Sequence, residues 1–281
     1  MKDYLVCIDS DGCVFDTMEI KHKECFCPAY IQFFGLQPVS KYAREAWDFA
    51  NLYSSFRGVN RFPVLLKALD VLRDRREVLE RGFVTPELPS LRSYIAEGNP
   101  LNNAGVEAYV NAHPEDAEMK TVLAWSYDVN RRIGEMVRGV PPFPYVRQQL
   151  QRLSEFADIV IVSATETRAL EREWSENQLL ELVTAVKGQE AGSKKAVIAS
   201  LKDRYTHVLM IGDAPGDQAA ALENGVAFYP ICPDQEARAW EQFSDCITPF
   251  RKGTYGTLQQ TFIEHFETLL PEEPGWERGS L

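Results

Sequence analysis

The chain has 281 residues, of which 45% are hydrophobic, so it can bury one large core or two ordinary ones. Its 41 acidic side chains outnumber the 30 basic ones and give a formal net charge of -11, which argues against nucleic acid and anionic membranes as partners. A site for a small anionic substrate must therefore supply its own positive charge from a metal ion, Lys, Arg or helix N-termini.

The first predicted strand is the apolar run YLVCID (4–9), and similar runs recur in the second half of the chain. These runs are apolar on both faces, which is typical of parallel strands buried between two layers of helices. Helical patterns separate them, and this alternation predicts a doubly wound parallel sheet of the α/β class. The further predicted strands are DIVIVSAT (158–165), HVLMIGD (207–213), VAFYPI (226–231) and a weaker run, LVTAVKG (182–188); the predicted helices lie at 145–156, 192–201 and 215–225.

Residues 17–138 contain no convincing buried strand, and their apolar positions follow a helical period. The clearest helical patterns cover 62–82 and 119–139, and each ends on a glycine, a common helix stop. The sequence GVPPFP then breaks the chain before the next helix. We therefore predict an α/β core formed by residues 1–16 and 139–281, interrupted after its first strand by a large, all-helical cap at 17–138.

The N-terminal apolar run is too short for a signal peptide and meets an acidic residue at Asp9. No run of about 18 apolar residues occurs in the sequence. The six cysteines are scattered and do not form a disulfide framework, which suits a reducing compartment. We expect a cytoplasmic protein; the sequence implies no protein partner and leaves the oligomeric state open.

Carboxylates and hydroxyls follow the predicted strands at the points where these strands end. Ligands of an open parallel sheet bind beyond the carboxyl ends of its strands, so these side chains are expected to converge. A cluster of Asp oxygens is suited to Mg²⁺, and the ion would neutralise acids whose burial is otherwise costly. The residues concerned are Asp9 and Asp11 after the first strand, Ser163 and Thr165 after the strand at 158–165, and Asp213 and Asp217 after the strand at 207–213.

Four motifs in this order carry a resemblance to a known family. They are D-x-D-G-x-V-x-D from Asp9 to Asp16, the hydroxyl-bearing VSAT, a Lys before the next strand, and G-D-x-x-x-D from Gly212 to Asp217. Together they resemble the motifs of the haloacid dehalogenase-like (HAD) hydrolase superfamily, and the insert resembles the C1 helical cap of that superfamily. The resemblance implies a Rossmann-like core. A Mg²⁺-binding receiver-like domain of the same sheet class is the alternative, but it offers no reason for the cap or for Asp11.

The resemblance also implies roles for the acids. Asp9 is the expected nucleophile, which would form an aspartyl-phosphate, and Asp11 is the expected general acid and base. Mg²⁺ would be held by Asp9, by the backbone carbonyl of Asp11, and by Asp213, with Asp217 completing or orienting the set. On this account Ser10 points away from the site and has no role.

Phosphate oxygens would be bound by Ser163 and by backbone N–H groups near it, with Ala164 and Gly12 as the candidates. Gly12 would also let the chain leave the strand so that Asp11 reaches the leaving group. The expected active-site lysine is Lys194, since apolar residues follow it at positions that point into the protein. Lys195 is the alternative.

Arg57 and Arg61 flank Gly58 in the cap and could donate to an anionic or hydroxylated substrate, although a plain turn before a helix explains them equally well. Asp11 separates this chain from haloacid dehalogenases, which lack an acid two residues after the nucleophile. The sequence therefore predicts a Mg²⁺-dependent phosphatase of a small phosphorylated metabolite. The alternatives are a phosphomutase of the β-phosphoglucomutase type and a non-catalytic phosphate- or metal-binding regulatory module.

Overall fold

A computed structural model describes residues 2–276, and the chain divides into two compact units. The core unit comprises Met1–Met18 and Arg138–Leu270, and the helical unit comprises Glu19–Val137 together with the segment that follows Leu270. None of the described helices is long and apolar enough to cross a membrane.

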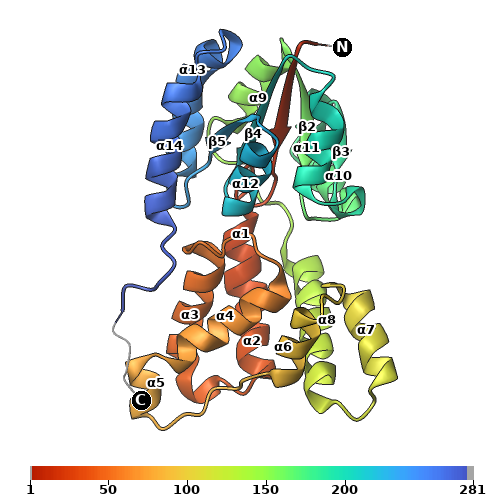
Figure 1. Ribbon diagram of the computed structural model, residues 1–281, viewed down its shortest axis with the longest axis vertical. Coiled ribbons are helices and arrows are strands. Elements are labelled where there is room, and N and C mark those ends of the chain that lie inside the picture. The colour runs from red at the N-terminus through yellow and green to blue at the C-terminus, as the bar shows by residue number, and fades with distance from the viewer. Residues whose placement is uncertain (1, 277–281) are drawn as a thin grey trace. The chain divides into compact units, whose positions relative to one another are not determined.

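The core unit contains a five-stranded sheet in the order β3-β2-β1-β4-β5, and every neighbouring pair is parallel (Figure 1). This arrangement confirms the predicted α/β class, and the weak run at 182–188 forms only a three-residue edge strand. Ile8 pairs with Ile161 on one side and with Ile211 on the other, so the three central strands end at the same level. The strands are β1 (Tyr4–Ile8), β2 (Ala157–Val162), β3 (Ala185–Lys187), β4 (His207–Gly212) and β5 (Ala227–Pro230).

Helices cover both faces of this sheet, as a doubly wound fold requires (Figure 1). Side chains of β1 alternate between the faces: Val6 and Ile8 pack under α9, α10 and α13, whereas Leu5 and Cys7 pack under α11, α12 and α14. The helices are α9 (Val146–Ser154), α10 (Thr167–Glu176), α11 (Lys194–Lys202), α12 (Pro215–Glu223), α13 (Glu236–Arg251) and α14 (Gly256–Leu269), with 3₁₀ turns at Leu180–Leu182 and Gln189–Ala191.

The helical unit contains no strand among its described residues. Its core combines aliphatic and aromatic side chains, and Trp47 and Trp125 are fully buried in it. The chain enters through α1 (Thr17–Ile20) and a π-helix (Lys21–Phe26); the further helices are α2 (Cys27–Phe33), a 3₁₀ turn (Gln37–Val39), α3 (Ser40–Leu52), α4 (Arg61–Arg73), α5 (Arg76–Glu80), α6 (Pro89–Ala96), α7 (Asn103–Ala112) and α8 (Ala117–Met136).

The helix predicted at 62–82 is wrong in one respect, because the chain breaks between α4 and α5. Arg75 is extended, with a ψ of 126°, and its side chain is almost fully buried. Its guanidinium pairs with Glu45 at 2.5 Å and lies over the ring of Tyr42 at 4.7 Å. These tertiary contacts outweigh the helical pattern of the sequence.

The described residues that follow Leu270 pack within the helical unit, although the sequence assigned them to the α/β core. The N–H of Ser55 donates to the carbonyl of Pro271 at 3.2 Å. The ring of Trp276 lies 5.6 Å from that of Phe49 and 4.6 Å from the Arg75 guanidinium. An aromatic contact and a cation–π contact therefore hold the tail, and its sequence does not predict them.

Asp48 on α3 is expected to make the stability of the helical unit depend on pH. Burial raises the pKa of Asp48 to about 6, against the usual 3.8; Lys23 opposes the shift and Glu19 adds to it. A raised folded-state pKa means that the ionised form destabilises the fold, by an amount that grows as pH rises from about 4 to about 6. We expect Asp48→Asn to raise Tm at about pH 7.5, with a gain that shrinks as the pH falls toward 4. Thermal denaturation across this range checks it, and a pH-independent gain would contradict it.

Candidate active site

Three carboxylates from two strand ends and a helix start meet in the core unit. Asp9 follows β1, Asp213 follows β4, and Asp217 lies in the first turn of α12. One oxygen of each carboxylate lies within 4.8 Å of the others, and all three residues are buried. The site lies at the carboxyl edge of β1 and β4, which are neighbours in the sheet although Asp9 and Asp213 are far apart in the chain.

Asp217 owes its place to the tight turn between β4 and α12. Its Oδ2 accepts the backbone N–H groups of Asp213 at 3.2 Å and Ala214 at 3.1 Å, so the side chain caps the helix. Gly212 makes this approach possible, because a Cβ at that position would lie 2.4 Å from the Asp217 carboxyl carbon. The glycine of the G-D-x-x-x-D motif is thus required by packing.

Lys194 connects two of these carboxylates. Its ammonium donates to Asp9 Oδ2 and to Asp217 Oδ1, each at 2.5 Å. Lys194 is the first residue of α11, after Ser193, whose hydroxyl caps the helix by accepting the N–H of Ala196. The alternative, Lys195, pairs instead with Glu223 at 2.6 Å on the exposed side of the helix. The structure therefore brings Lys194 to the acids; its catalytic role stays a prediction.

Burial and charge act together on this cluster. Burial raises the pKa of Asp9 to about 6; the Lys194 ammonium opposes the shift, and the Asp217 charge adds to it. Burial alone would lower the pKa of Lys194, but Asp217 and Asp9 raise it above its usual value. The lysine is accordingly a permanent positive charge at neutral pH, and it faces more than one carboxylate.

Asp11 lies beside the cluster, held by two hydroxyl groups. Thr165 donates to its Oδ2 at 2.8 Å, and the hydroxyl of Thr17 donates to its Oδ1. Gly12 adopts a positive φ of 73°, and its N–H donates to the carbonyl of Phe15 at 2.8 Å, closing the turn that carries Asp11. The sequence marked Thr165 as a strand-end hydroxyl but gave no signal for Thr17.

The other predicted phosphate-binding residues lie at the end of β2. Ser163 is buried, and its hydroxyl accepts the N–H of Thr165 at 3.3 Å, in a local turn. Ala164 is exposed. The start of α10 already holds an anion from the chain itself, since Glu190 accepts the N–H of Thr167 at 3.1 Å. Binding of phosphate by Ser163, Ala164 and Gly12 stays a prediction.

The two arginines predicted to bind substrate are both in the helical unit. Arg57 is buried and donates to the carbonyl of Leu52 at 2.9 Å. Arg61 donates to Ser126 Oγ at 3.0 Å and to Asn130 Oδ1 at 2.7 Å, and burial lowers its pKa to about 10. These contacts fix both side chains within their own unit. Their role toward a substrate stays a prediction.

Ser10 makes structural contacts through its backbone and its side chain, and these go beyond the expectation that its side chain points away from the site. Its backbone N–H donates to Asp9 Oδ1 at 2.7 Å, so it orients the carboxylate. Its hydroxyl is fully buried and accepts the indole N–H of Trp174 at 3.0 Å. The sequence carried no signal for this contact, because an acceptor for a residue 164 positions away leaves no local pattern.

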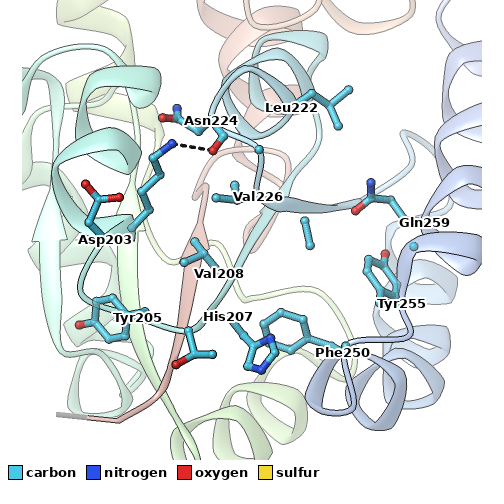
Figure 2. A pocket seen from close by; sticks show the side chains of 16 residues that line it. Asp203, Tyr205, His207, Val208, Leu222, Asn224, Val226, Phe250, Tyr255 and Gln259 are labelled. Carbon is cyan, nitrogen blue, oxygen red and sulfur yellow. Dashed lines mark hydrogen bonds between the residues drawn. The ribbon is translucent and has the colours of Figure 1, made fainter.

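A separate groove of about 680 Å³ lies at the opposite, amino edge of the sheet (Figure 2). Val208, Val226 and Phe250 form part of its lining, and Lys202 donates to the Asn224 carbonyl at its border. None of the predicted site residues lines it. The groove is therefore not part of the candidate active site.

Comparisons with known proteins found matches among solved structures alone. No protein-family model matches the sequence, and no curated protein matches it significantly. Solved structures do match, at low identity. By its motifs and its sheet, the chain resembles the HAD-like hydrolases.

Three of the matching structures illustrate the range. A putative phosphoglycolate phosphatase from Lactobacillus delbrueckii subsp. bulgaricus is 15% identical, with 81% of this chain and 85% of that chain covered and a TM-score of 0.45. A haloacid dehalogenase-like hydrolase from Streptococcus pneumoniae is 16% identical, covering 84% and 90%, with a TM-score of 0.42. A putative beta-phosphoglucomutase from Bacteroides vulgatus is 15% identical, covering 85% and 81%, with a TM-score of 0.43.

Proposed function

We propose that this protein is a Mg²⁺-dependent phosphatase that hydrolyses a small phosphorylated metabolite through an aspartyl-phosphate. The observation that carries the proposal is the meeting of Asp9, Asp213 and Asp217, with Lys194 bonded to Asp9 and Asp217 and with Asp11 on the adjoining turn. Three buried carboxylates beside one ammonium suit a site that receives further positive charge.

The donor set fits Mg²⁺. Carboxylate oxygens are the hard ligands that this ion prefers, and their spacing lets one ion contact several of them. Asp9 and Asp213 would bind it with the carbonyl of Asp11, while Asp217, fixed by backbone N–H groups, would complete or orient the set. When bound, the ion would reduce the repulsion between the carboxylates and an incoming phosphate and stabilise charge on its oxygens.

Asp9 is the proposed nucleophile. The N–H of Ser10 and the ammonium of Lys194 donate to its two oxygens, so the carboxylate is held in one orientation before a substrate arrives. Attack on phosphorus forms a bond from the Asp9 carboxylate to the phosphoryl group and breaks the bond to the leaving oxygen. Lys194 would balance negative charge on the nucleophile and the transferred group.

Asp11 is the proposed general acid and base. Protonated, it would give its proton to the leaving oxygen; as a carboxylate, it would then take a proton from the water that attacks the aspartyl-phosphate. The hydroxyls of Thr165 and Thr17 hold its carboxylate in place. Ser163, with the backbone of Ala164 and Gly12, would bind the remaining phosphate oxygens.

The helical unit is proposed to choose the substrate. Arg61 is the better candidate of the two arginines, because burial lowers its pKa and its guanidinium donates to the neutral side chains of Ser126 and Asn130. A second anionic or hydroxylated group on the metabolite would suit this guanidinium. Arg57 is more deeply buried and donates to the backbone carbonyl of Leu52, which favours a structural role within the helical unit over direct contact with a substrate.

The test is phosphate release from a panel of phosphorylated metabolites, measured with and without Mg²⁺. We expect release only with Mg²⁺, and a Tm that rises with Mg²⁺ because the ion binds the folded state. Asp213→Asn should increase the Mg²⁺ concentration needed for both effects by at least about 10-fold. Asp245→Asn, the same change at an exposed position on α13, is the matched control and should leave both unchanged.

Two outcomes would overturn the proposal. If Mg²⁺ changes neither hydrolysis nor Tm, the chain is better described as a non-catalytic binding module. If a sugar phosphate is isomerised without release of free phosphate, the protein is a phosphomutase that uses the same acids.

A further inference from the structure

The turn between Ser10 and Phe15 carries the proposed acid–base residue and follows directly on the proposed nucleophile. The carbonyl of Ser10 accepts three backbone N–H groups, from Val14 at 2.8 Å, Phe15 at 3.1 Å and Cys13 at 3.3 Å. The turn is therefore compact and centred on one residue. A shift of Ser10 would move Asp9 through the N–H that it donates to that carboxylate.

Two buried tryptophans from different helices donate to this turn. The indole N–H of Trp174 on α10 donates to Ser10 Oγ at 3.0 Å, and that of Trp240 on α13 donates to the Cys13 carbonyl at 2.7 Å. Both side chains are fully buried in the same apolar cluster, on one face of the sheet. Two segments that enter the fold more than 160 residues later thus hold the start of the chain.

Ring packing adds to these hydrogen bonds. The ring of Trp174 meets that of Phe15 edge to face, with centroids 5.7 Å apart and planes at 85°. The carbonyl of Trp240 accepts the side-chain N–H of Gln149 at 3.1 Å, which ties α13 to α9 behind the turn. Each tryptophan is therefore itself fixed by its surroundings.

The indole N–H groups favour a specific function over filling of the core. Phenylalanine could fill much of the same volume, and a buried N–H costs free energy unless it finds an acceptor. Trp47 and Trp125, in the helical unit, have indole nitrogens without a hydrogen-bond partner among the described residues, so a buried tryptophan in this protein does not always have one. Those of Trp174 and Trp240 both find acceptors on the turn.

We propose that Trp174 and Trp240 are positioning residues that clamp the turn and thereby preorganise Asp9 and Asp11 for phosphoryl transfer. The effect of this clamp on catalysis rests on the proposed function. The clamp itself is a structural statement and can be tested without any activity.

The kinetic test uses Trp174→Phe, Trp240→Phe and Ser10→Ala on the full chain, with the best substrate of the metabolite panel. We expect each to lower kcat by about 10-fold and to leave KM nearly unchanged, since small misplacements of reacting groups cost rate steeply. The double variant Trp174→Phe/Ser10→Ala should be no slower than the slower of the two single variants. Each single change already removes the hydrogen bond from the Trp174 indole to the Ser10 hydroxyl, so the second change has no further bond of this pair to remove. Trp47→Phe is the control and should keep full kcat.

A second measurement does not depend on activity. In ¹H–¹⁵N spectra, Ser10→Ala should move the indole resonance that Trp174→Phe removes, and leave the indole resonance that Trp47→Phe removes in place. In Trp174→Phe, the amides of Val14 and Phe15 should exchange with deuterium faster, because the carbonyl that they bond is less firmly held.

The outcomes separate the two proposals. If the native protein hydrolyses no phosphate ester but the resonance and exchange changes occur, the clamp stands and the proposed function fails. If the native protein is active while the tryptophan variants and Ser10→Ala retain kcat and amide protection, the clamp is overturned. Should a tryptophan variant not fold, the shift of the Trp174 indole resonance and the amide exchange in Ser10→Ala decide. This variant removes little volume; it deletes the acceptor of Trp174 together with a longer hydrogen bond, of 3.4 Å, from the Ser10 hydroxyl to Glu173.

Discussion

Replacement of Asp9 by Asn is expected to abolish phosphate release and to leave the fold intact. An amide has nearly the shape of the carboxylate but cannot act as the nucleophile, so kcat/KM should fall by at least about 10³-fold. Lys194 would keep its bond to Asp217, and burial already disfavours the Asp9 charge, so a large loss of stability is not expected. Phosphate release and Tm measured on the same preparation check both parts.

The control for this variant is again Asp245→Asn, which makes the same chemical change on the exposed side of α13. It should retain native activity. Activity of Asp9→Asn within 10-fold of the native protein would contradict the nucleophile assignment, whatever the state of the metal site.

Gly212→Ala is expected to disable the site through packing alone. The added Cβ would lie 2.4 Å from both Cγ and Oδ2 of Asp217, a residue that is fully buried and bonded to Lys194 and to two backbone N–H groups. Asp217 would have to move, which should cost about 2 kcal/mol of stability, and phosphate release should fall at least about 100-fold. Denaturant titration and phosphate release measure these effects.

Gly216→Ala is the matched control, four residues further along the chain in the first turn of α12. Apart from its chain neighbours and the backbone of its own helix, no atom of the described residues lies within 4 Å of a Cβ built there. Alanine is also the better helix former, so this variant should be as stable as the native protein or roughly 0.5 kcal/mol more stable. Equal behaviour of the two variants would show that the close approach of Asp217 to Gly212 is not required.

The sequence was sufficient to predict the parallel sheet, because each strand is marked by a local run of apolar residues. A run such as Tyr4–Ile8 is apolar on both faces, and that pattern already states that the strand is buried between two layers. The parallel register then brings Asp9 and Asp213 to one edge, as the strand-end rule predicts. Lys194 could also be chosen over Lys195 from the sequence. The apolar positions that follow it show which side of α11 faces the protein interior.

The helical unit was less predictable in detail. Its helical period was clear, yet the break at Arg75 follows from an ion pair with Glu45 and from stacking on rings that are distant in sequence. The position of Trp276 depends on the same contacts. Periodicity reports which face of a helix is apolar, but it cannot report a buried guanidinium that ends the helix.

The sequence by itself determined which acids follow the strand ends, namely Asp9, Asp11 and Asp213, because local patterns place the strands before them. Only the tertiary structure decided what holds them, namely the hydroxyl of Thr17 on Asp11 and the indoles of Trp174 and Trp240 on the turn. The physical reason is range: a strand or a helix is encoded by its neighbours in the chain, whereas a hydrogen bond across the fold forms only after the whole core has packed.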